Sequence, residues 1–553
     1  MWNKRWQLCF STDSKIIGIQ YGITSMSFLL LGFMLMLLMR WQLAFPGHPL
    51  PLLGKLFSDS LMPGGIMIPD FYNMLGAMHG TIMIFLGVVP MGVGAFGNYL
   101  VPLMVGSPVA AFPRLNRFGF WLYFLGGLVW LFSFLLPGGA ASAGWTSYPP
   151  LSILASPGQT WWLVGLLCIA ISSQIGAINL LTTALQSALP GMSFSRWPIT
   201  VWAQSVAAFL LLLAFPPLEI AALLQLMDRL SGSSFFLPSG LIISGTPLTV
   251  AGGGNPLLWQ HLFWFLAHPE VYVLILPAIG IVAEILVSGT RKPLYGYPTI
   301  VRSLLFLGAL SFLVWAHHMF LTDMGVKLSG FFQATTMIVS IPSVIVLTSF
   351  LLTLWGASIR FTVPMLFALA FLPMFGLGGL TGIPLGLAAS DIPLHDTYYV
   401  IGHFHYIVAP GTLFALMGGL YYWYPRITGR MMNEAWGKIH FWLSFTSINF
   451  VFFPMLLLGL AGVSRRLYDQ TIYAHGRAVQ PLNLVISMAA WTLAVAQLPF
   501  LFNLLTSWKW GKPAPSKNPW GSPTLDWAEM LPPRIVRGAY EEENLNEVTT
   551  PRN

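Results

Sequence analysis

Charged residues are scarce in this sequence. Asp, Glu, Lys and Arg make up 8% of the 553 residues, whereas roughly 25% is usual for a soluble domain. Hydrophobic residues make up 56%, and a soluble fold with so few charges cannot cover that much apolar surface. This composition excludes a soluble globular protein. The apolar residues also occur in runs of about 20, which is the length needed to cross a bilayer. The sequence therefore predicts an all-α polytopic membrane protein.

Cysteine is almost absent. Cys9 and Cys168 are the only two, which excludes a disulfide framework and a thiolate metal cluster. Histidine, methionine or oxygen atoms must therefore bind any metal. The N-terminal residues are polar and lack the short apolar core of a cleaved signal peptide, so none is expected.

Counting the apolar runs predicts about twelve membrane spans. Their approximate ranges are 16–40, 74–104, 117–137, 161–186, 199–226, 257–288, 301–321, 332–356, 364–388, 398–424, 438–461 and 482–506. We therefore expect a core over 16–506, a cytoplasmic N-terminal segment over 1–15 and an irregular cytoplasmic tail over 507–553.

The formal net charge of +8 would suggest a nucleic-acid partner in a soluble protein. Here the basic residues lie between apolar runs, where they act as topology signals, so no nucleic-acid partner is expected. With a cytoplasmic N-terminus, the inner loops carry Arg114, Arg117, Arg196, Arg291, Lys292, Arg360, Arg426, Arg430 and Lys438. The opposite loops carry fewer basic residues, and the even number of spans returns the C-terminus to the cytoplasm.

Histidine indicates the chemistry. Six of the eleven histidines fall in or at the ends of apolar runs: His79, His268, His317, His318, His403 and His405. An imidazole in a membrane span is costly unless it is paired or binds a metal. Any one of these residues could be a hydrogen-bonded core histidine, but six together favour a metal site.

The spacing of these histidines limits which of them can bind the same metal. Successive helical residues turn by about 100°, so His403 and His405 point to nearly opposite faces and one helix could serve two cofactors. His317 and His318 are adjacent, and both could reach one metal if the helix end loosens. Neutral imidazoles suit copper and haem iron.

A second group of candidates lies in the run Trp259 to Pro277. His268 and Tyr272 are four residues apart and share a helix face, which would place a phenol beside a metal-bound imidazole. Glu270 is an ionisable group within an apolar run and is a candidate proton carrier. The alternative is a kink at Pro269 with Glu270 hydrogen-bonded locally.

The sequence resembles subunit I of the haem-copper oxidase superfamily from roughly Arg40 to Asp469. The matching strings are MRWQLAFPG, HGTIMIF, GNYLVPLM, AFPRLN, GWTSYPP, GAINLLTT, HLFWFLAHPEVYVLILP, VWAHHMF, GGLTGI, HDTYYVIGHFHYIV and GLAGVSRRLYD. The fold implied is a helix bundle that encloses two haems, expected to be of type a, and one copper.

The resemblance implies a role for each matching residue. His79 and His405 look like the axial ligands of the low-spin haem, and His403 looks like the ligand of the high-spin haem. His268, His317 and His318 look like the copper ligands. Tyr272 matches a tyrosine that cross-links to a copper-ligating histidine, and Glu270 matches a proton-donating glutamate.

Other matches surround the haems. Arg40 looks like the residue that pairs with a haem substituent, and Arg465 and Arg466 resemble the pair on the haem propionates. Trp264, Trp145 and Tyr148 look like packing residues. His395 and Asp396 resemble ligands of a magnesium site near the outer face.

Two positions depart from the family pattern. Val109 stands where an aspartate usually opens one proton channel, and Val346 stands where a lysine usually serves another. Polar residues of the first channel remain, namely Asn98, Asn116, Asn179, Ser172 and Ser173. We therefore expect proton uptake by a non-standard route, from another mouth or a partner subunit, with pumping weak or absent.

The function implied is that of the catalytic subunit of a respiratory terminal oxidase that reduces O2 to water. Quinol-using relatives carry a histidine and a glutamine where this chain has Phe71 and Met74, which favours cytochrome c or another small electron donor. This chain lacks the paired cysteines of a dinuclear copper site, so subunit II should carry it. Subunit III and membrane lipid are further expected partners, in a bacterial-type inner membrane.

Two alternatives remain open. The first is a non-pumping nitric oxide reductase on the same scaffold, which the loss of both channel entrances fits and Tyr272 opposes. The second is a twelve-helix transporter without haem, which explains the hydropathy and leaves the histidines unexplained.

Overall fold

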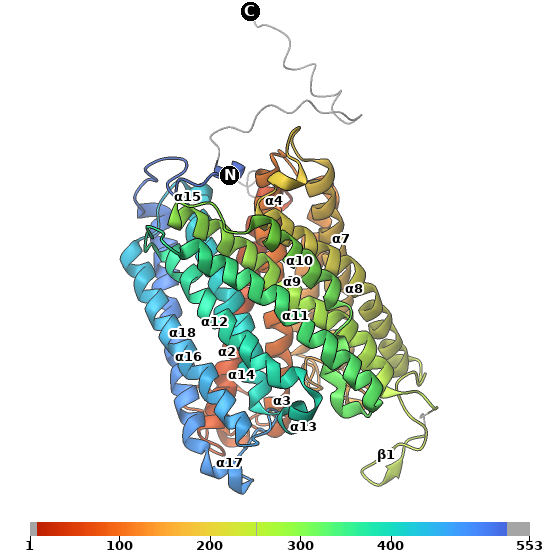
Figure 1. The fold of residues 1–553 in the computed structure, drawn as a ribbon. Coiled ribbons are helices and arrows are strands. Elements are labelled where there is room, and N and C mark those ends of the chain that lie inside the picture. The colour runs from red at the N-terminus through yellow and green to blue at the C-terminus, as the bar shows by residue number, and fades with distance from the viewer. Residues whose placement is uncertain (1–7, 250–251, 528–553) are drawn as a thin grey trace, which may run out of the picture.

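The computed structural model describes residues 8–249 and 252–527, which form one bundle of long helices (Figure 1). Twelve helical segments in these residues are long and apolar enough to cross a membrane. The predicted all-α polytopic fold is therefore confirmed.

Each of nine spans is one continuous α-helix. They are α2 (Ser14–Ala44), α5 (Pro113–Ser133), α7 (Gly158–Gln186), α8 (Ile199–Leu230), α9 (Pro256–Thr290), α11 (Gly325–Leu354), α12 (Val363–Gly386), α16 (Glu434–Leu460) and α18 (Gln480–Trp510).

The other three spans change helix type along their length. The second joins α3 (Pro69–Thr81), the π-helices η3 (Ile82–Val88) and η4 (Pro90–Gly97), and α4 (Asn98–Val105). The seventh joins α10 (Tyr297–Ser311) to the 3-10 helix η6 (Trp315–Thr322). The tenth joins α14 (Tyr398–Tyr406), the π-helix η7 (Ile407–Leu413) and α15 (Phe414–Thr428).

Short elements lie in the connections. They are η1 (Gly54–Leu56), η2 (Pro63–Gly65), α6 (Leu151–Leu154), η5 (Phe194–Arg196), the hairpin of β1 (Ile242–Ile243) and β2 (Thr246–Pro247), α13 (Ala388–Leu394), α17 (Ala474–Ala478) and η8 (Leu525–Trp527).

Polar caps and prolines explain where several spans begin. The side chains of Asp13, Asn255 and Asn433 accept hydrogen bonds from the first backbone N–H groups of α2, α9 and α16. Pro113 stands at the start of α5, where its missing N–H costs nothing. Hydropathy places this span at 117–137, but the proline starts the helix at 113 and the helix ends at Ser133.

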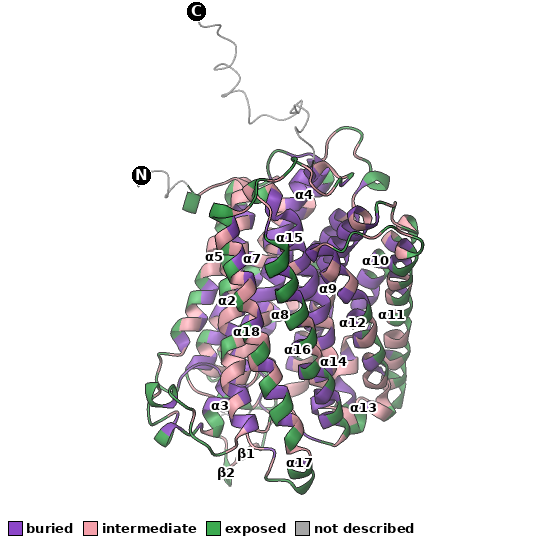
Figure 2. Ribbon diagram, turned by 90° about the vertical axis from the view of Figure 1, so that its left-hand side faces the viewer, coloured by how far each residue is buried: buried purple, intermediate pink, exposed green. Residues whose placement is uncertain are grey.

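Burial differs strongly among the spans. Helix α9 runs through the interior, whereas α11 and α18 lie at the periphery with exposed faces (Figure 2). Helix α9 packs against α8, and α16 packs against α18. The candidate residues on α9 are therefore held inside the protein.

Both ends of the described chain lie at the same end of the bundle. Tyr99 on α4 is within electrostatic range of Asp13, just before α2, and of Asp526, near the end of the described chain. This arrangement agrees with an even number of spans.

The predicted C-terminal tail is in part a packed segment. Residues 511–527 form no α-helix, but the indole N–H of Trp520 donates to the Tyr422 carbonyl oxygen at 2.7 Å and Trp527 is only 2% exposed. The rest of the tail, 528–553, and residues 1–7 of the N-terminal segment lie outside the described residues.

Candidate metal centre

Three histidines converge in the interior. His268 lies on α9 and His317 and His318 lie on η6, and one ring nitrogen from each falls within 4.8 Å of the others. The Nδ1 atom of His268 is 3.3 Å from Nε2 of His318. Three imidazole nitrogens at this separation match the donor set that copper accepts.

The helix end at His317 and His318 is loosened, which is the condition under which both rings could reach one metal. Helix α10 ends at Ser311, and the chain continues as a 3-10 helix in which Met319 has non-helical dihedral angles (φ −128°, ψ 20°). The hydroxyl of Thr336 on α11 lies 2.9 Å from Nδ1 of His317. The ring of His318 stacks on Trp264, with centroids 3.9 Å apart.

The donor chemistry fits the copper implied by the family. The Nε2 atom of His268 is buried and has no hydrogen-bond partner in the described residues. An orphaned buried nitrogen is costly. The contact between His268 and His318 brings two ring nitrogens within hydrogen-bond distance, and a bound cation would supply the partner that Nε2 of His268 lacks.

The other three intramembrane histidines share a geometry. The Nδ1 atoms of His79, His403 and His405 lie 2.8 to 2.9 Å from the backbone oxygens of Gly32, Gly378 and Ile401, respectively. Because a carbonyl oxygen only accepts, Nδ1 carries the proton in each ring. Nε2 is then the unprotonated nitrogen, which is the state in which histidine binds iron.

His403 and His405 face different neighbours, as their spacing predicts. His403 contacts Gly378 and Thr381 on α12, whereas the ring of His405 stacks on Phe452 of α16. His405 is within electrostatic range of His79, and His403 is within range of His317. One short helix thus presents an imidazole toward each of two separate groups of histidines.

Two π-helical segments and one closely packed glycine lie next to these candidate ligands. The π-helices η3 and η7 begin just after His79 and His405, and π-helical turns are frequent at functional sites. A Cβ at Gly382 would lie 2.7 Å from Cε1 of His403. Only glycine leaves the His403 ring enough space against α12.

Tyr272 lies beside His268, and Glu270 lies between these two residues in the sequence of α9. The rings of His268 and Tyr272 have centroids 4.9 Å apart at 62°. Glu270 is 2% exposed, and neither carboxyl oxygen has a hydrogen-bond partner in the described residues. The alternative in which Glu270 is satisfied by a local hydrogen bond therefore has no support here.

Arg40 is a fully buried cation on α2. Its Nε donates to Ser487 at 3.0 Å, and one terminal nitrogen donates to the side chain and backbone of Asn483. The other terminal nitrogen, Nη1, is buried without a partner in the described residues. The orphaned N–H groups fit the polar substituent of a haem as the missing acceptor.

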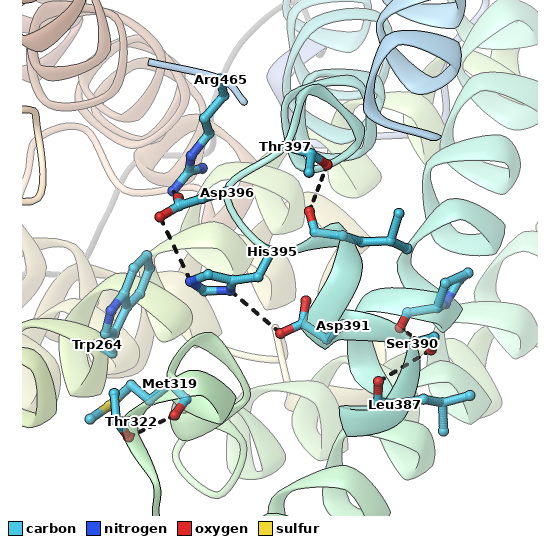
Figure 3. Close-up of polar contacts among 12 residues, drawn as sticks. Trp264, Met319, Thr322, Leu387, Ser390, Asp391, His395, Asp396, Thr397 and Arg465 are labelled. Carbon is cyan, nitrogen blue, oxygen red and sulfur yellow. Dashed lines mark hydrogen bonds and ion pairs between the residues drawn. The ribbon is translucent and has the colours of Figure 1, made fainter. Parts of the chain in front are cut away.

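The predicted magnesium residues lie in the loop between α13 and α14. His395 sits between two carboxyls, with Nδ1 3.4 Å from Asp391 and Nε2 3.9 Å from Asp396 (Figure 3). Asp396 also pairs with Arg465. Burial alone would raise the pKa of Asp396, but Arg465, His395 and Arg466 together hold that pKa below its usual range. Asp396 is therefore a carboxylate at neutral pH.

Arg466 and Tyr148 line the same region. Arg466 donates to the Thr146 hydroxyl at 3.5 Å, and burial together with the neighbouring Arg465 lowers its pKa. The indole N–H of Trp264 donates to the Tyr148 hydroxyl at 2.5 Å, and burial raises the pKa of Tyr148 to about 12. The ring of Trp145 meets that of Trp264 edge to face, with centroids 6.0 Å apart.

The structure brings together only some of the predicted channel residues. Asn116 donates to Asn98 at 2.7 Å, whereas Asn179 accepts from the backbone N–H of Phe112 and Ser172 donates to the Gly119 carbonyl. Ser173 lies beside Ser172 on α7 and is half-buried.

The two valines at the altered entrances differ in exposure. Val109 is 41% exposed in the loop before α5, and Val346 is 1% exposed on α11. Neither side chain can exchange a proton.

Several residues with clear contacts to the site were missed by sequence reasoning. Thr336 and Thr381 touch candidate ligands, and Gly382 makes room for one, but spacing along the chain gives no signal for such contacts. Glu284 is different: it is a carboxyl inside the apolar run 257–288, and the argument applied to Glu270 would have found it.

Together, the fold and the clustered histidines are those of a polytopic membrane protein with a candidate metal centre. The family model for cytochrome c and quinol oxidase polypeptide I matches residues 16–492. The chain belongs to this family, and the resemblance noted from its motifs is confirmed.

Individual relatives agree. The alternative cytochrome c oxidase subunit 1 of Bradyrhizobium diazoefficiens is 43% identical over 524 residues, covering 94% of this chain and 86% of the relative. The cytochrome c oxidase subunit 1 of Synechocystis is 43% identical over 537 residues, covering 97% and 90% of the two chains.

A solved structure supports the fold. A cryo-EM structure of a heme-copper terminal oxidase dimer matches with a TM-score of 0.73 over 94% of this chain and 87% of the other, at 19% identity. At that identity the match concerns the fold alone.

Proposed function

We propose that this chain is the catalytic subunit of a respiratory terminal oxidase that reduces O2 to water. The observation that carries the proposal is the convergence of His268, His317 and His318 beside His403. The three clustered histidines would hold a copper and His403 would hold a haem iron, which together supply the redox chemistry for O2. The haems and copper would supply the electrons for O2 reduction, since protein side chains do not perform this chemistry themselves.

The residues of this chain would hold and orient these groups. His79 and His405 bind the low-spin haem, His403 binds the high-spin haem, and the three clustered histidines bind copper. The backbone carbonyls at Nδ1 fix the ring orientations of the haem ligands. Tyr272, close to His268, donates a proton and an electron to the reaction.

The residues around the haems would neutralise and anchor their substituents. Arg465 and Arg466 bind the propionates, Arg40 pairs with a ring substituent, and Trp264 packs against the site. His395 and Asp396 bind magnesium, for which the carboxylate of Asp396 is a suitable hard ligand.

Electrons would come from cytochrome c through a dinuclear copper in subunit II. Support comes from Phe71 and Met74 at the positions where quinol-using relatives carry polar residues, and from the lack of paired cysteines in this chain. Subunit III and lipid would cover part of the apolar periphery. The expected setting is a bacterial inner membrane with both termini in the cytoplasm.

Glu270 would carry protons toward the site, but from a non-standard entrance because Val109 and Val346 cannot exchange protons. We expect weak or absent pumping. Proton release per electron in sealed vesicles measures this, and the stoichiometry of a standard two-channel relative would overturn the expectation.

The decisive experiment combines metal analysis with turnover. The purified enzyme should contain two haems, which a pyridine haemochrome spectrum should identify as type a. It should also contain one copper in addition to the dinuclear copper of subunit II. It should consume O2 with reduced cytochrome c. An enzyme that turns over NO but not O2 would support the nitric oxide reductase alternative.

The transporter alternative predicts no reduced-minus-oxidised haem signal. It also gives no reason for three imidazoles to converge in an apolar interior, where each unpaired nitrogen is costly.

A further inference from the structure

Helix α9 carries a second buried glutamate, far from the histidines. Glu284 is 5% exposed and lies sixteen residues beyond His268, which is about 24 Å along a helix. A carboxyl kept inside a membrane span is costly and is a functional candidate by default. None of the roles described above uses it.

Glu284 lies against the N-terminal end of α8. Its Oε1 is 3.5 Å from the hydroxyl of Thr200, the second residue of that helix, whose backbone N–H also donates to the carboxyl. Gly280 permits the approach, because a Cβ there would lie 2.7 Å from the Thr200 Cα. Free N–H groups at a helix N-terminus stabilise a carboxylate, so the site favours the charged form that burial opposes.

A second buried carboxyl lies near Glu284. Asp526, in the packed segment before the end of the described chain, is within electrostatic range of Glu284 and is fully buried. Its Oδ2 accepts from the indole N–H of Trp423 at 2.7 Å, but Oδ1 has no partner in the described residues. Burial raises the pKa of Asp526 above its usual range.

The other groups near this pair are neutral at ordinary pH or half-buried. Tyr297 from α10 and Tyr422 from α15 are within electrostatic range of Glu284. Arg426, at the end of α15, is within range of Asp526. Among the described residues, Arg426 is thus a cation within electrostatic range of Asp526, and the two carboxyls disfavour simultaneous ionisation.

A surface recess lies next to Glu284 along the chain, beginning at the neighbouring residue Ile285. It is lined by Ser288, Gly289, Arg360, Thr362, Tyr422 and Trp520, and Arg360 is exposed. The hydroxyls of Ser288 and Tyr422 lie 2.6 Å apart, and Ser288 is one helical turn beyond Glu284 and donates to its backbone carbonyl.

Polar groups continue inward from Glu284. Thr200 and Gln204 are four residues apart and share a face of α8. Gln204 is fully buried, and its Oε1 has no partner in the described residues. That oxygen would lie 3.1 Å from a Cβ at Gly97, the residue before Asn98. Asn98 in turn binds Asn116.

We propose that Glu284, with Asp526 within electrostatic range, is the proton-uptake group of this chain, taking protons from the recess at Ser288 and Tyr422 and passing them toward Gln204 and Asn98. In each transfer the protonated carboxyl loses its proton to the interior and the carboxylate is reprotonated from the aqueous side. The inference rests on the proposed function, because O2 reduction is what consumes the protons.

The test replaces Glu284 in the purified, fully assembled enzyme. Glu284→Gln should lower steady-state O2 turnover by about 10²-fold, the lower end of what loss of a proton-transfer group costs, with unchanged haem content and spectrum. Proton uptake from the medium in a single turnover should slow by the same factor. Asp526→Asn should produce a smaller loss.

The matched control is Glu219→Gln. Glu219 is another glutamate in a membrane span, on α8, but it is half-buried and bonded to Gln174, away from the recess. Its turnover should stay within about twofold of wild type. If Glu284→Gln also stays within twofold, the inference is wrong while the proposed function stands. If the wild-type enzyme itself does not reduce O2, the proposed function fails.

A measurement on folded protein distinguishes a structural role of Glu284 from a role in proton transfer. If Glu284→Gln does not retain haem, infrared difference spectra of wild type and Glu284→Asp decide instead. We expect a carboxyl C=O band that changes between the reduced and oxidised enzyme and shifts in Glu284→Asp. Identical difference spectra in this region would show that Glu284 does not exchange its proton and would overturn the inference.

Discussion

Helices α9 and α11 have the same mean hydropathy and opposite surroundings. In α9, 89% of the most apolar window is buried inside the protein, whereas in α11 only 28% is buried. Hydropathy reports the preference of a segment for an apolar medium. It does not distinguish a helix surrounded by protein from one that faces lipid or a partner, since both media are apolar.

Polar residues distinguish these two helices. His268, Glu270 and Glu284 on α9 turn into the protein. On α11, Ser340 and Ser343 donate to the carbonyls of Met337 and Val339 within the same helix. Thr336 also touches His317, and Gln333, Thr335 and Thr353 bond to backbone groups of neighbouring segments. What distinguishes α9 is its buried ionisable side chains, since the one ionisable residue of α11, Lys327, is exposed.

The largest effect is expected from removing a candidate copper ligand on α9. His268→Asn should abolish copper binding at this centre and lower O2 turnover by more than about 100-fold, which exceeds the loss expected when a residue that only orients a ligand is changed. Metal analysis and oxygen consumption measure this. His261→Asn is the control, since His261 lies on the same helix but is exposed. A His268→Asn enzyme with full copper content would contradict the assignment.

Truncating one leucine on each helix tests the difference in burial directly. Leu276 on α9 is fully buried and Leu351 on α11 is 51% exposed. Leu276→Ala should destabilise the protein by about 2 to 5 kcal/mol because it leaves a cavity. Leu351→Ala should change stability by less than about 0.5 kcal/mol. Unfolding in detergent gives both values, and equal losses would mean that another subunit buries α11 as fully as α9 is buried.

Glycine positions provide a smaller test of the same difference. A Cβ at Gly280 on α9 would meet the backbone of α8 at 2.7 Å, whereas at Gly330 on α11 it would meet nothing within 4 Å. Gly280→Ala should therefore destabilise by about 1 to 3 kcal/mol. Gly330→Ala should stabilise slightly, because alanine favours the helix. Thermal unfolding midpoints of the two variants should move in opposite directions.

The smallest effect on the metal centre is expected from changing Thr336, the α11 residue whose hydroxyl contacts His317. Thr336→Val removes the hydroxyl at Nδ1 of His317 and should weaken copper binding by about tenfold. Competition with a copper chelator measures the affinity. Ser340→Ala, which removes a hydroxyl bonded only within α11, should leave the affinity unchanged. Equal affinities in Thr336→Val and wild type would show that Thr336 does not orient the ligand.

Much of the site was predictable from local spacing. The opposite faces of His403 and His405 follow from the helical repeat, and their contacts with α12 and α16 agree with it. For His317 and His318, spacing gave only the condition that the helix end must loosen if both are to reach one metal, and the structure has a 3-10 segment there.

Long-range partners were not predictable in this way. Nothing in the local sequence indicates that Thr336, nineteen residues away, touches His317, or that a glycine on α12 makes room for His403. The predicted channel residues show the same limit, because Asn98 and Asn116 meet whereas Asn179 binds the loop backbone at Phe112.

The sequence by itself determined that this is a twelve-span membrane protein with imidazole ligands, because the free energy of transfer to an apolar medium and the helical repeat are local properties. Only the tertiary structure decided which apolar helix is central, which histidines converge, and that Glu284 and Asp526 lie within electrostatic range of each other. These contacts join distant segments, and packing of whole helices fixes them.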